Sequence, residues 1–340
     1  MKAPAAHASA SAPSARESDR AGEKRTAGAL ARVAVAAGLT AYILWKSHPR
    51  AVLAAAAGAD WRPLAVAVLL VFVDRALMGY RWVVLLRSID TATRLPLAAI
   101  LRIFFVSTFV GTFLPSVGGD AVRAYSIAKL HVRGGDAVAS VFMDRILGVA
   151  SILVMALVGL TLARDLAGNW VIIASLAVAG GVCLVTLLLV FSRRTALAAS
   201  TFLTRLPTAV QLTGQQLLES IRRYSAYHRQ LANVLACSVA VQVLRIVQAY
   251  YLGRGLGIDA TLGTYFAFVP LILLVMLLPI TFNGIGTGQA AFLWFFARAG
   301  VTAAAAFALS ALFIGLGIIG NLPGGILYAF GRRRPTSALD

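Results

Sequence analysis

The sequence is poor in ionisable residues, and in acidic residues most of all. Only 13% of its 340 residues are charged, and 13 aspartates and glutamates stand against 31 lysines and arginines. A soluble domain of this size keeps about a quarter of its residues charged. Hydrophobic residues make up 59% of the chain, and its mean hydropathy is +0.82. This composition excludes an ordinary soluble enzyme and indicates an integral membrane protein.

Residues that form disulfides, metal sites or catalytic centres are also scarce. The two cysteines, Cys183 and Cys237, lie inside apolar runs, so a structural disulfide is not expected. The four histidines are scattered outside these runs, which predicts no metal cluster and no cofactor. The acidic residues form no D-x-x-D pair for Mg²⁺, and no buried histidine accompanies a serine or cysteine. We therefore expect that the chain is not an enzyme.

Apolar runs of about twenty residues recur along the chain, each long enough to cross a ~30 Å hydrocarbon core as a helix. Their apolar residues are continuous rather than alternating, which argues against a barrel. We predict an all-α polytopic membrane protein with six full spans and two broken segments, at 95–118 and 262–300. The predicted spans are at about 27–45, 63–86, 137–163, 170–191, 231–253 and 302–330.

Outside the transmembrane domain, expected at 27–330, the chain has two tails, and within it one long connection. Residues 1–26 are rich in Ala and Ser and are typical of a disordered tail, and residues 331–340 form a basic tail. The connection at 192–230 carries six arginines and an apolar stripe at helical spacing, made of Leu217, Leu218, Ile221 and Tyr224. This pattern predicts an amphipathic helix whose arginines face anionic lipid headgroups, and the alternative is a solvated loop.

Basic residues between the apolar runs set the expected topology. If both broken segments re-enter and leave on the side from which they came, twenty lysines and arginines face the cytoplasm and five face the other side. Full crossing by every segment would place residues 119–136 and 192–230 outside. The positive-inside rule therefore favours the re-entrant arrangement in the inner (plasma) membrane, with both termini cytoplasmic. The same rule explains the net charge of +18 without nucleic acid as a partner.

The two broken segments share a pattern of proline followed by glycine. Proline removes a backbone donor and glycine accepts any backbone angle, so Pro115 and Pro279 mark helix ends at membrane depth. Two breaks that enter from opposite faces point to a transporter's substrate site and are compatible with an inverted repeat. The alternative is two ordinary proline kinks. The candidate substrate-binding residues in these segments are Pro115, Gly118, Gly119, Asn283, Gly284 and Gly286.

Charged side chains follow the first break. Asp120 and Arg123 are three residues apart and share a helical face, so Arg123 can hold a lipid phosphate. Asp120 can hold Arg123 in place, carry a proton or cap the helix. Helix starts just after the glycines would aim backbone N–H groups at the same anion. In the next span Asp144 and Arg145 precede Gly148, which predicts close packing and an internal ion pair.

Two further spans carry polar residues that would support such a site. Charges inside a bilayer are costly and are usually paired or functional. Snorkelling to the interface is the alternative for any one of them, but several charged helices in one small bundle favour a polar central cavity. The predicted supporting residues are Asp74, Arg81, Gln242, Arg245 and Gln248.

These motifs resemble a known family, the flippase-like membrane proteins related to the transmembrane part of lysylphosphatidylglycerol synthases. The resemblance covers about residues 28–330 and implies the movement of phospholipids, polyprenyl-phosphate-linked or hopanoid-type lipids between leaflets. It rests on Arg81-Trp82, on Pro115 with Gly118-Gly119-Asp120 and Arg123, on Asp144-Arg145 with Gly148, and on the segment from Pro279 to Gly286.

The chain departs from the family pattern in two places. Gly288-Gln289 stands where the family usually has arginine–glutamate, and no soluble aminoacyl-transfer domain follows the last span. We therefore expect lipid binding or translocation without aminoacyl-transferase activity. The alternatives are a membrane scaffold for lipid or envelope synthesis enzymes and an intramembrane enzyme that acts on lipid phosphates.

Overall fold

The computed structural model describes residues 58–88, 95–114, 118–166, 168–205, 207–277 and 287–330. Within these ranges every regular element is a helix, and five helices are long and apolar enough to cross a membrane. The expected class, an all-α polytopic membrane protein, is therefore confirmed.

The five long helices lie where the sequence predicted spans. They are α3 (Trp61–Arg87), α6 (Gly134–Leu162), α7 (Trp170–Phe191), α10 (His228–Gly255) and α13 (Ala303–Ala329). At 1.5 Å per residue, each is about 33 to 44 Å long, which is enough to cross the hydrocarbon core. The predicted first span at 27–45 lies outside the described residues.

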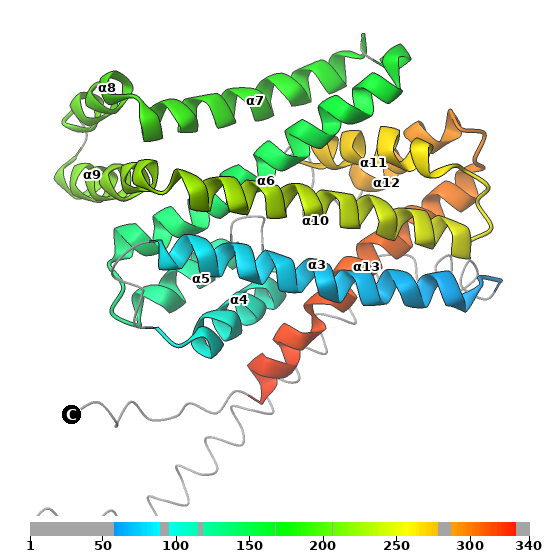
Figure 1. Ribbon diagram of the computed structural model, residues 1–340, viewed down its shortest axis with the longest axis horizontal. Helices are drawn as coiled ribbons and strands as arrows, with labels where there is room; N and C mark the ends of the chain where they lie inside the picture. Colours follow the sequence, from blue (N-terminus) through cyan, green and yellow to red (C-terminus); the bar gives the residue numbers. More distant parts are fainter. Residues whose placement is uncertain are drawn as a thin grey trace, which may run out of the picture.

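Side-chain caps set where several of these helices begin. Asp60 accepts a hydrogen bond from a first-turn N–H of α3, and Asn169 and Thr302 cap α7 and α13 in the same way. The Asp60 N–H also donates to the carbonyl of Gly255 at 2.9 Å, which ties the start of α3 to the end of α10. These two helices lie side by side and run in opposite directions (Figure 1).

Each broken segment contributes a pair of short helices. The first pair is α4 (Leu97–Gly111) and α5 (Gly118–Ala128), and the second is α11 (Leu262–Met276) and α12 (Thr287–Ala297). The pairs lie toward opposite ends of the long helices (Figure 1). The expected interruptions are therefore present, although Pro115 and Pro279 themselves lie outside the described residues.

The first pair is held together by a contact between two glycines. A Cβ on Gly119 would lie 2.7 Å from the Cα of Gly111 and 3.0 Å from the carbonyl oxygen of Ser107. Both neighbours are backbone atoms that cannot move aside, so only glycine allows α4 and α5 to approach this closely.

The connections are divided between two ends of the bundle as the re-entrant arrangement requires. The turn at 129–133 and the segment between α7 and α10 lie at one end in Figure 1, whereas the short helix η2 (Arg164–Leu166) and residues 256–261 lie at the other. Which of these ends faces the cytoplasm stays a prediction.

The basic connection after α7 differs from the single helix that was expected. It folds as α8 (Arg193–Leu203), α9 (Thr208–Arg223) and the short helix η3 (Tyr224–Ala226). Ile221 and Tyr224 of the predicted stripe are buried, and the Tyr224 hydroxyl donates to the carbonyl of Leu85 at 3.0 Å. Burial, together with the Asp136 carboxylate, raises the pKa of Tyr224 well above its usual value, so its hydroxyl stays protonated. Ile221 and Tyr224 are therefore apolar positions of the stripe because they pack against the helix bundle.

Large apolar side chains cover the outside of the bundle. On α7, for example, Val178, Val182, Leu184 and Val185 are each about half exposed. A soluble protein seldom exposes so continuous an apolar surface, whereas lipid tails satisfy it. Several polar side chains of α3, α6 and α10, among them Arg81, Asp144 and Gln242, are instead turned inward and line the site described next.

Candidate functional site

A cavity of about 440 Å³ lies at the centre of the bundle and is lined by α3, α4, α5, α6, α10 and α13. Three of its residues, Arg75, Gln242 and Gly317, each lie fourteen positions from the start of a long helix. That is about 21 Å along the helix and leaves a similar length beyond it. The cavity is therefore near the middle of the membrane, where transporters hold their substrates.

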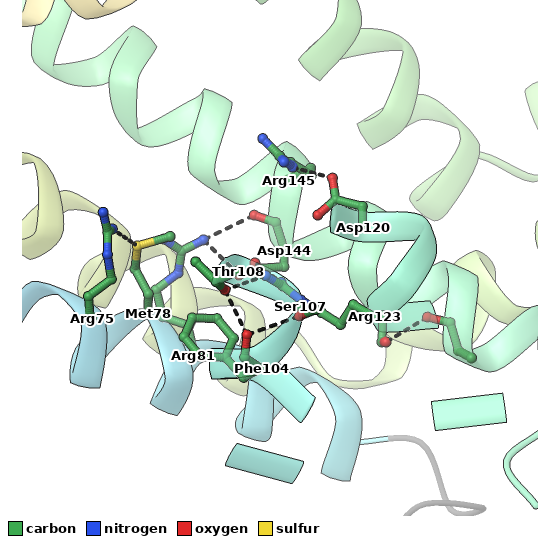
Figure 2. Close-up of polar contacts among 12 residues, drawn as sticks. Arg75, Met78, Arg81, Phe104, Ser107, Thr108, Asp120, Arg123, Asp144 and Arg145 are labelled. Carbon is green, nitrogen blue, oxygen red and sulfur yellow. Dashed lines mark hydrogen bonds and ion pairs between the residues drawn. The ribbon is translucent and has the colours of Figure 1, made fainter. Parts of the chain in front are cut away.

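Asp144 of α6 is the centre of the charged lining. Its carboxylate accepts from Nη2 of Arg81 at 2.8 Å and from Nη1 of Arg123 at 3.4 Å. Figure 2 shows this carboxylate between side chains that come from α3 and α5. All three side chains are less than one-tenth exposed, so each depends on the others for charge compensation.

Arg123 has protein partners at each of its guanidinium nitrogens. Besides Asp144, it donates to the hydroxyls of Ser107 at 3.2 Å and Thr108 at 3.3 Å (Figure 2). Its guanidinium also lies over the rings of Trp82 and Phe104, with the carbon at 5.3 and 4.8 Å from their centroids. Arg123 is thereby fixed between α3, α4 and α6, and its role in binding a phosphate stays a prediction.

Asp120 pairs with a different arginine from the one that sequence spacing suggested. Its carboxylate accepts from Nε of Arg145 at 2.5 Å, across the gap between α5 and α6 (Figure 2). The expectation that Asp120 orients Arg123 by contact is therefore wrong, and so is an internal ion pair between Asp144 and Arg145. Each aspartate instead bonds the arginine that follows the other, so the two pairs cross between the helices.

Asp74 organises the opposite wall of the cavity. Its two carboxylate oxygens accept from Arg75 at 2.9 Å and from Arg245 of α10 at 3.3 Å. Arg75 also donates to the carbonyl of Gly317 in α13, and the sulfur of Met78 lies against both arginines. Asp74 and Arg81, which were expected to share a face of α3, therefore do not pair with each other: Asp74 bonds Arg75 and Arg245, whereas Arg81 bonds Asp144.

Small residues make room for the guanidinium groups. A Cβ on Gly320 of α13 would lie 3.1 Å from Nε of Arg75 and 2.8 Å from Val71, so α13 can pack on α3 only with glycine there. Gly148 lies beside Arg81, where a Cβ would make ordinary contact at 3.5 Å. The close packing expected at Gly148 is therefore not found, because a Cβ there would only make an ordinary van der Waals contact.

The charges in this region do not balance. The cavity is lined by five arginines, namely Arg75, Arg81, Arg123, Arg145 and Arg245. Three carboxylates face them, those of Asp74, Asp120 and Asp144. Two positive charges therefore remain in excess over the described part of the chain. The sequence of segments 115–117 and 278–286, which lie outside the described residues, contains no ionisable residue.

Most of the predicted site residues that can be placed do meet at this cavity. Gly119, Asp120, Arg123, Asp144, Arg145, Arg81, Gln242 and Arg245 line it. Gly118 begins α5 beside it, and Asp74 contacts two lining arginines. Gln248 is buried but does not line the cavity, so its supporting role stays a prediction. Outside the described residues lie Pro115, Asn283, Gly284 and Gly286.

Several lining residues were not predicted from the sequence. Ser107, Thr108 and Thr112 of α4, together with Asn321 of α13, belong to the lining. Asn321 donates to the Thr112 hydroxyl at 2.8 Å. A lone asparagine inside a 27-residue apolar helix is a signal that could have been used, because an amide at membrane depth needs a partner.

The sequence matches a known protein family over most of its length. The family described as Lysylphosphatidylglycerol synthase TM region matches residues 29–324, which include every residue that lines the cavity. A comparison with curated proteins finds no match. The family match and the arrangement of spans agree with the resemblance in the motifs, and this chain therefore belongs to the family of lysylphosphatidylglycerol synthase transmembrane regions.

Proposed function

We propose that this protein binds the phosphate-bearing headgroup of a lipid in its central cavity and moves it between the leaflets of the inner membrane. The observation that carries the proposal is the excess of arginine over aspartate at mid-membrane depth. Uncompensated guanidinium charges are costly there, and an anionic ligand would repay that cost. Phosphate suits them because its oxygens accept paired hydrogen bonds from arginine.

The chemistry of the lining favours binding over catalysis. The Ser107 and Thr108 hydroxyls both donate to the carbonyl of Phe104 and accept from Arg123, so neither has a general base beside it. The described lining contains no histidine or cysteine. A scaffold for other enzymes would need neither the cavity nor its charge excess, so a charge-dependent transport rate separates these alternatives.

Arg75 is the best residue with which to test the proposal. Its Nε is buried without a hydrogen-bond partner among the described residues, and Asp74 keeps Arg245 as a partner when Arg75 is replaced. Loss of one charge-assisted phosphate contact should weaken binding about tenfold to hundredfold. We expect this loss for Arg75→Gln and a smaller loss for Arg75→Lys, which keeps the charge. Arg298→Gln is the matched control, because Arg298 is exposed and lies outside the cavity.

The measurement is the transfer of phosphatidic acid, labelled on its acyl chain with a fluorophore, across the membrane of reconstituted vesicles. Dithionite quenches the outer-leaflet label, and labelled phosphatidylcholine reports on non-selective leakage. The wild type and Arg298→Gln should transfer phosphatidic acid at equal rates, and Arg75→Gln should be about tenfold slower or worse. If all variants that insert and elute as single species transfer the lipid equally, the arginine cavity is not its route.

A further inference from the structure

Four polar atoms of the cavity lining are buried and have no hydrogen-bond partner among the described residues. They are Nε of Arg75, Nε of Arg81, Oε1 of Gln242 and Oδ1 of Asn321. Buried polar groups are seldom left unpaired in proteins, because losing their hydrogen bonds to water is costly. Two donors and two acceptors that meet at one cavity therefore describe the hydrogen-bonding pattern of the ligand.

The surrounding bonds fix which end of each amide faces the ligand. Ser151 donates its hydroxyl hydrogen to the carbonyl of Gly148, so its oxygen can only accept from the Gln242 amide nitrogen, 3.1 Å away. Thr112 likewise donates to the carbonyl of Thr108 and accepts from the Asn321 nitrogen. In both amides the nitrogen is therefore used within the protein, and the oxygen is left to accept from a ligand.

The two kinds of atom require two kinds of ligand group. The arginine Nε atoms and the excess of two positive charges match a phosphate with two negative charges. The amide oxygens require O–H or N–H donors next to that phosphate. An ammonium group could donate, but it would lie among five guanidinium groups with too few carboxylates to compensate it. Hydroxyl groups supply the same hydrogen bonds without charge.

We propose that the headgroup is a polyol or sugar phosphate with two negative charges, in which Gln242 and Asn321 recognise hydroxyl groups and Arg75 and Arg81 recognise the phosphate. This inference rests on the proposed function and specifies its substrate class. A cavity of about 440 Å³ holds the volume of about fifteen water molecules at about 30 Å³ each. That is enough for a glycerol phosphate or a similar headgroup, whereas the acyl chains would remain outside.

Three soluble phosphates separate the roles of charge and hydroxyl groups. Glycerol 1-phosphate carries the charge and two hydroxyls, propyl phosphate is its counterpart without hydroxyls, and phosphoethanolamine carries an ammonium. Affinity is measured from the increase in thermal unfolding temperature of the purified protein in detergent at constant ionic strength. We expect the wild type to prefer glycerol 1-phosphate to propyl phosphate about fourfold to hundredfold, because each of two neutral hydrogen bonds contributes about twofold to tenfold. Phosphoethanolamine should bind most weakly.

The variants Gln242→Leu and Asn321→Leu test the recognition of hydroxyls. Neither should leave a protein group unpaired, because the Ser151 and Thr112 hydroxyls keep their backbone acceptors. The double variant should bind glycerol 1-phosphate and propyl phosphate equally, with its affinity for propyl phosphate unchanged. Gln248→Leu is the matched control, since Gln248 is a buried amide of α10 outside the cavity and its loss should leave the preference intact.

The possible failures of the two proposals can be told apart. Equal binding of the three phosphates by the wild type, or a preference that survives in the double variant, would overturn the hydroxyl assignment while leaving phosphate binding in place. If neither the wild type nor any variant binds any of the three phosphates, both proposals are overturned. A short-chain phosphatidylglycerol phosphate should bind more tightly than glycerol 1-phosphate. Equal affinity would reject a lipid substrate and show that the cavity takes the free polyol phosphate.

Discussion

Replacing Asp144 by asparagine removes the charge that holds two buried arginines. In the wild type its carboxylate lies 2.8 Å from Arg81 and 3.4 Å from Arg123, and both arginine side chains are at most 8% exposed. Asn keeps the shape and one acceptor oxygen but leaves both guanidinium charges uncompensated. Breaking a buried ion pair in this way costs about 3–5 kcal/mol. Coulomb's law at an effective dielectric constant of 20 gives a similar value, about 4 kcal/mol at 4 Å.

The assay is SDS-induced unfolding of the purified protein in mixed micelles. We expect Asp144→Asn to lower the free energy of unfolding by about 3–5 kcal/mol. Asp259→Asn is the control, because Asp259 is fully exposed and pairs with Arg254 at 3.6 Å. An exposed pair of this kind contributes little to stability, because water screens its charges. The double variant Asp144→Asn with Arg123→Gln should lose less than the two single changes together, since it removes one of the unpaired charges. Equal unfolding midpoints for Asp144→Asn and the wild type would refute the view that Asp144 holds the bundle together.

Three further predictions follow from the fold. Gly119→Ala should disrupt the contact between α4 and α5 and lower the yield of folded protein. Gly181→Ala is the control and should be neutral, because a Cβ there meets no atom within 4 Å. Size-exclusion profiles after heating compare the two variants. Single cysteines in α8 and at 129–133, introduced on a background without Cys183 and Cys237, should both resist an impermeant thiol reagent added to intact cells, and labelling of either would contradict the re-entrant topology. Gln289→Glu should leave lipid transfer unchanged, because Gln289 does not line the described cavity, and faster transfer would show that the family's acidic residue acts at that position.

The sequence was sufficient for the spans because a transmembrane helix is encoded locally. Twenty consecutive apolar residues must form a helix in lipid whatever lies beside them, and the predicted span at 170–191 agrees with α7 to the residue. The breaks after α4 and α11 were also predictable, since proline and glycine act on their own backbone.

The pairing of charges was not predictable, because it depends on how neighbouring helices are rotated. Asp120 and Arg123 share a face of α5, but α6 offers each of them a closer partner, Arg145 and Asp144 respectively. The position of Gln248 away from the cavity lining has a geometric reason. Residues spaced three apart turn by 300° per step, so Gln248 lies about 120° around α10 from Gln242 and leaves the cavity face.

Asp144 and Asp74 are the two carboxylates that bond several arginines, and through both of them α3 is linked to the other helices of the cavity. Asp144 joins α3 to α5 and α6 through Arg81 and Arg123, and Asp74 joins α3 to α10 through Arg245. A ligand phosphate bound at Nε of Arg81 would share that guanidinium charge with the Asp144 carboxylate at Nη2, and the two anions would repel each other. Ligand affinity and the strength of the link between α3 and α6 are then reciprocally coupled, and each weakens the other by the same free energy. The ion pairs that stabilise the bundle therefore also set the minimum affinity a headgroup needs before it can separate these helices.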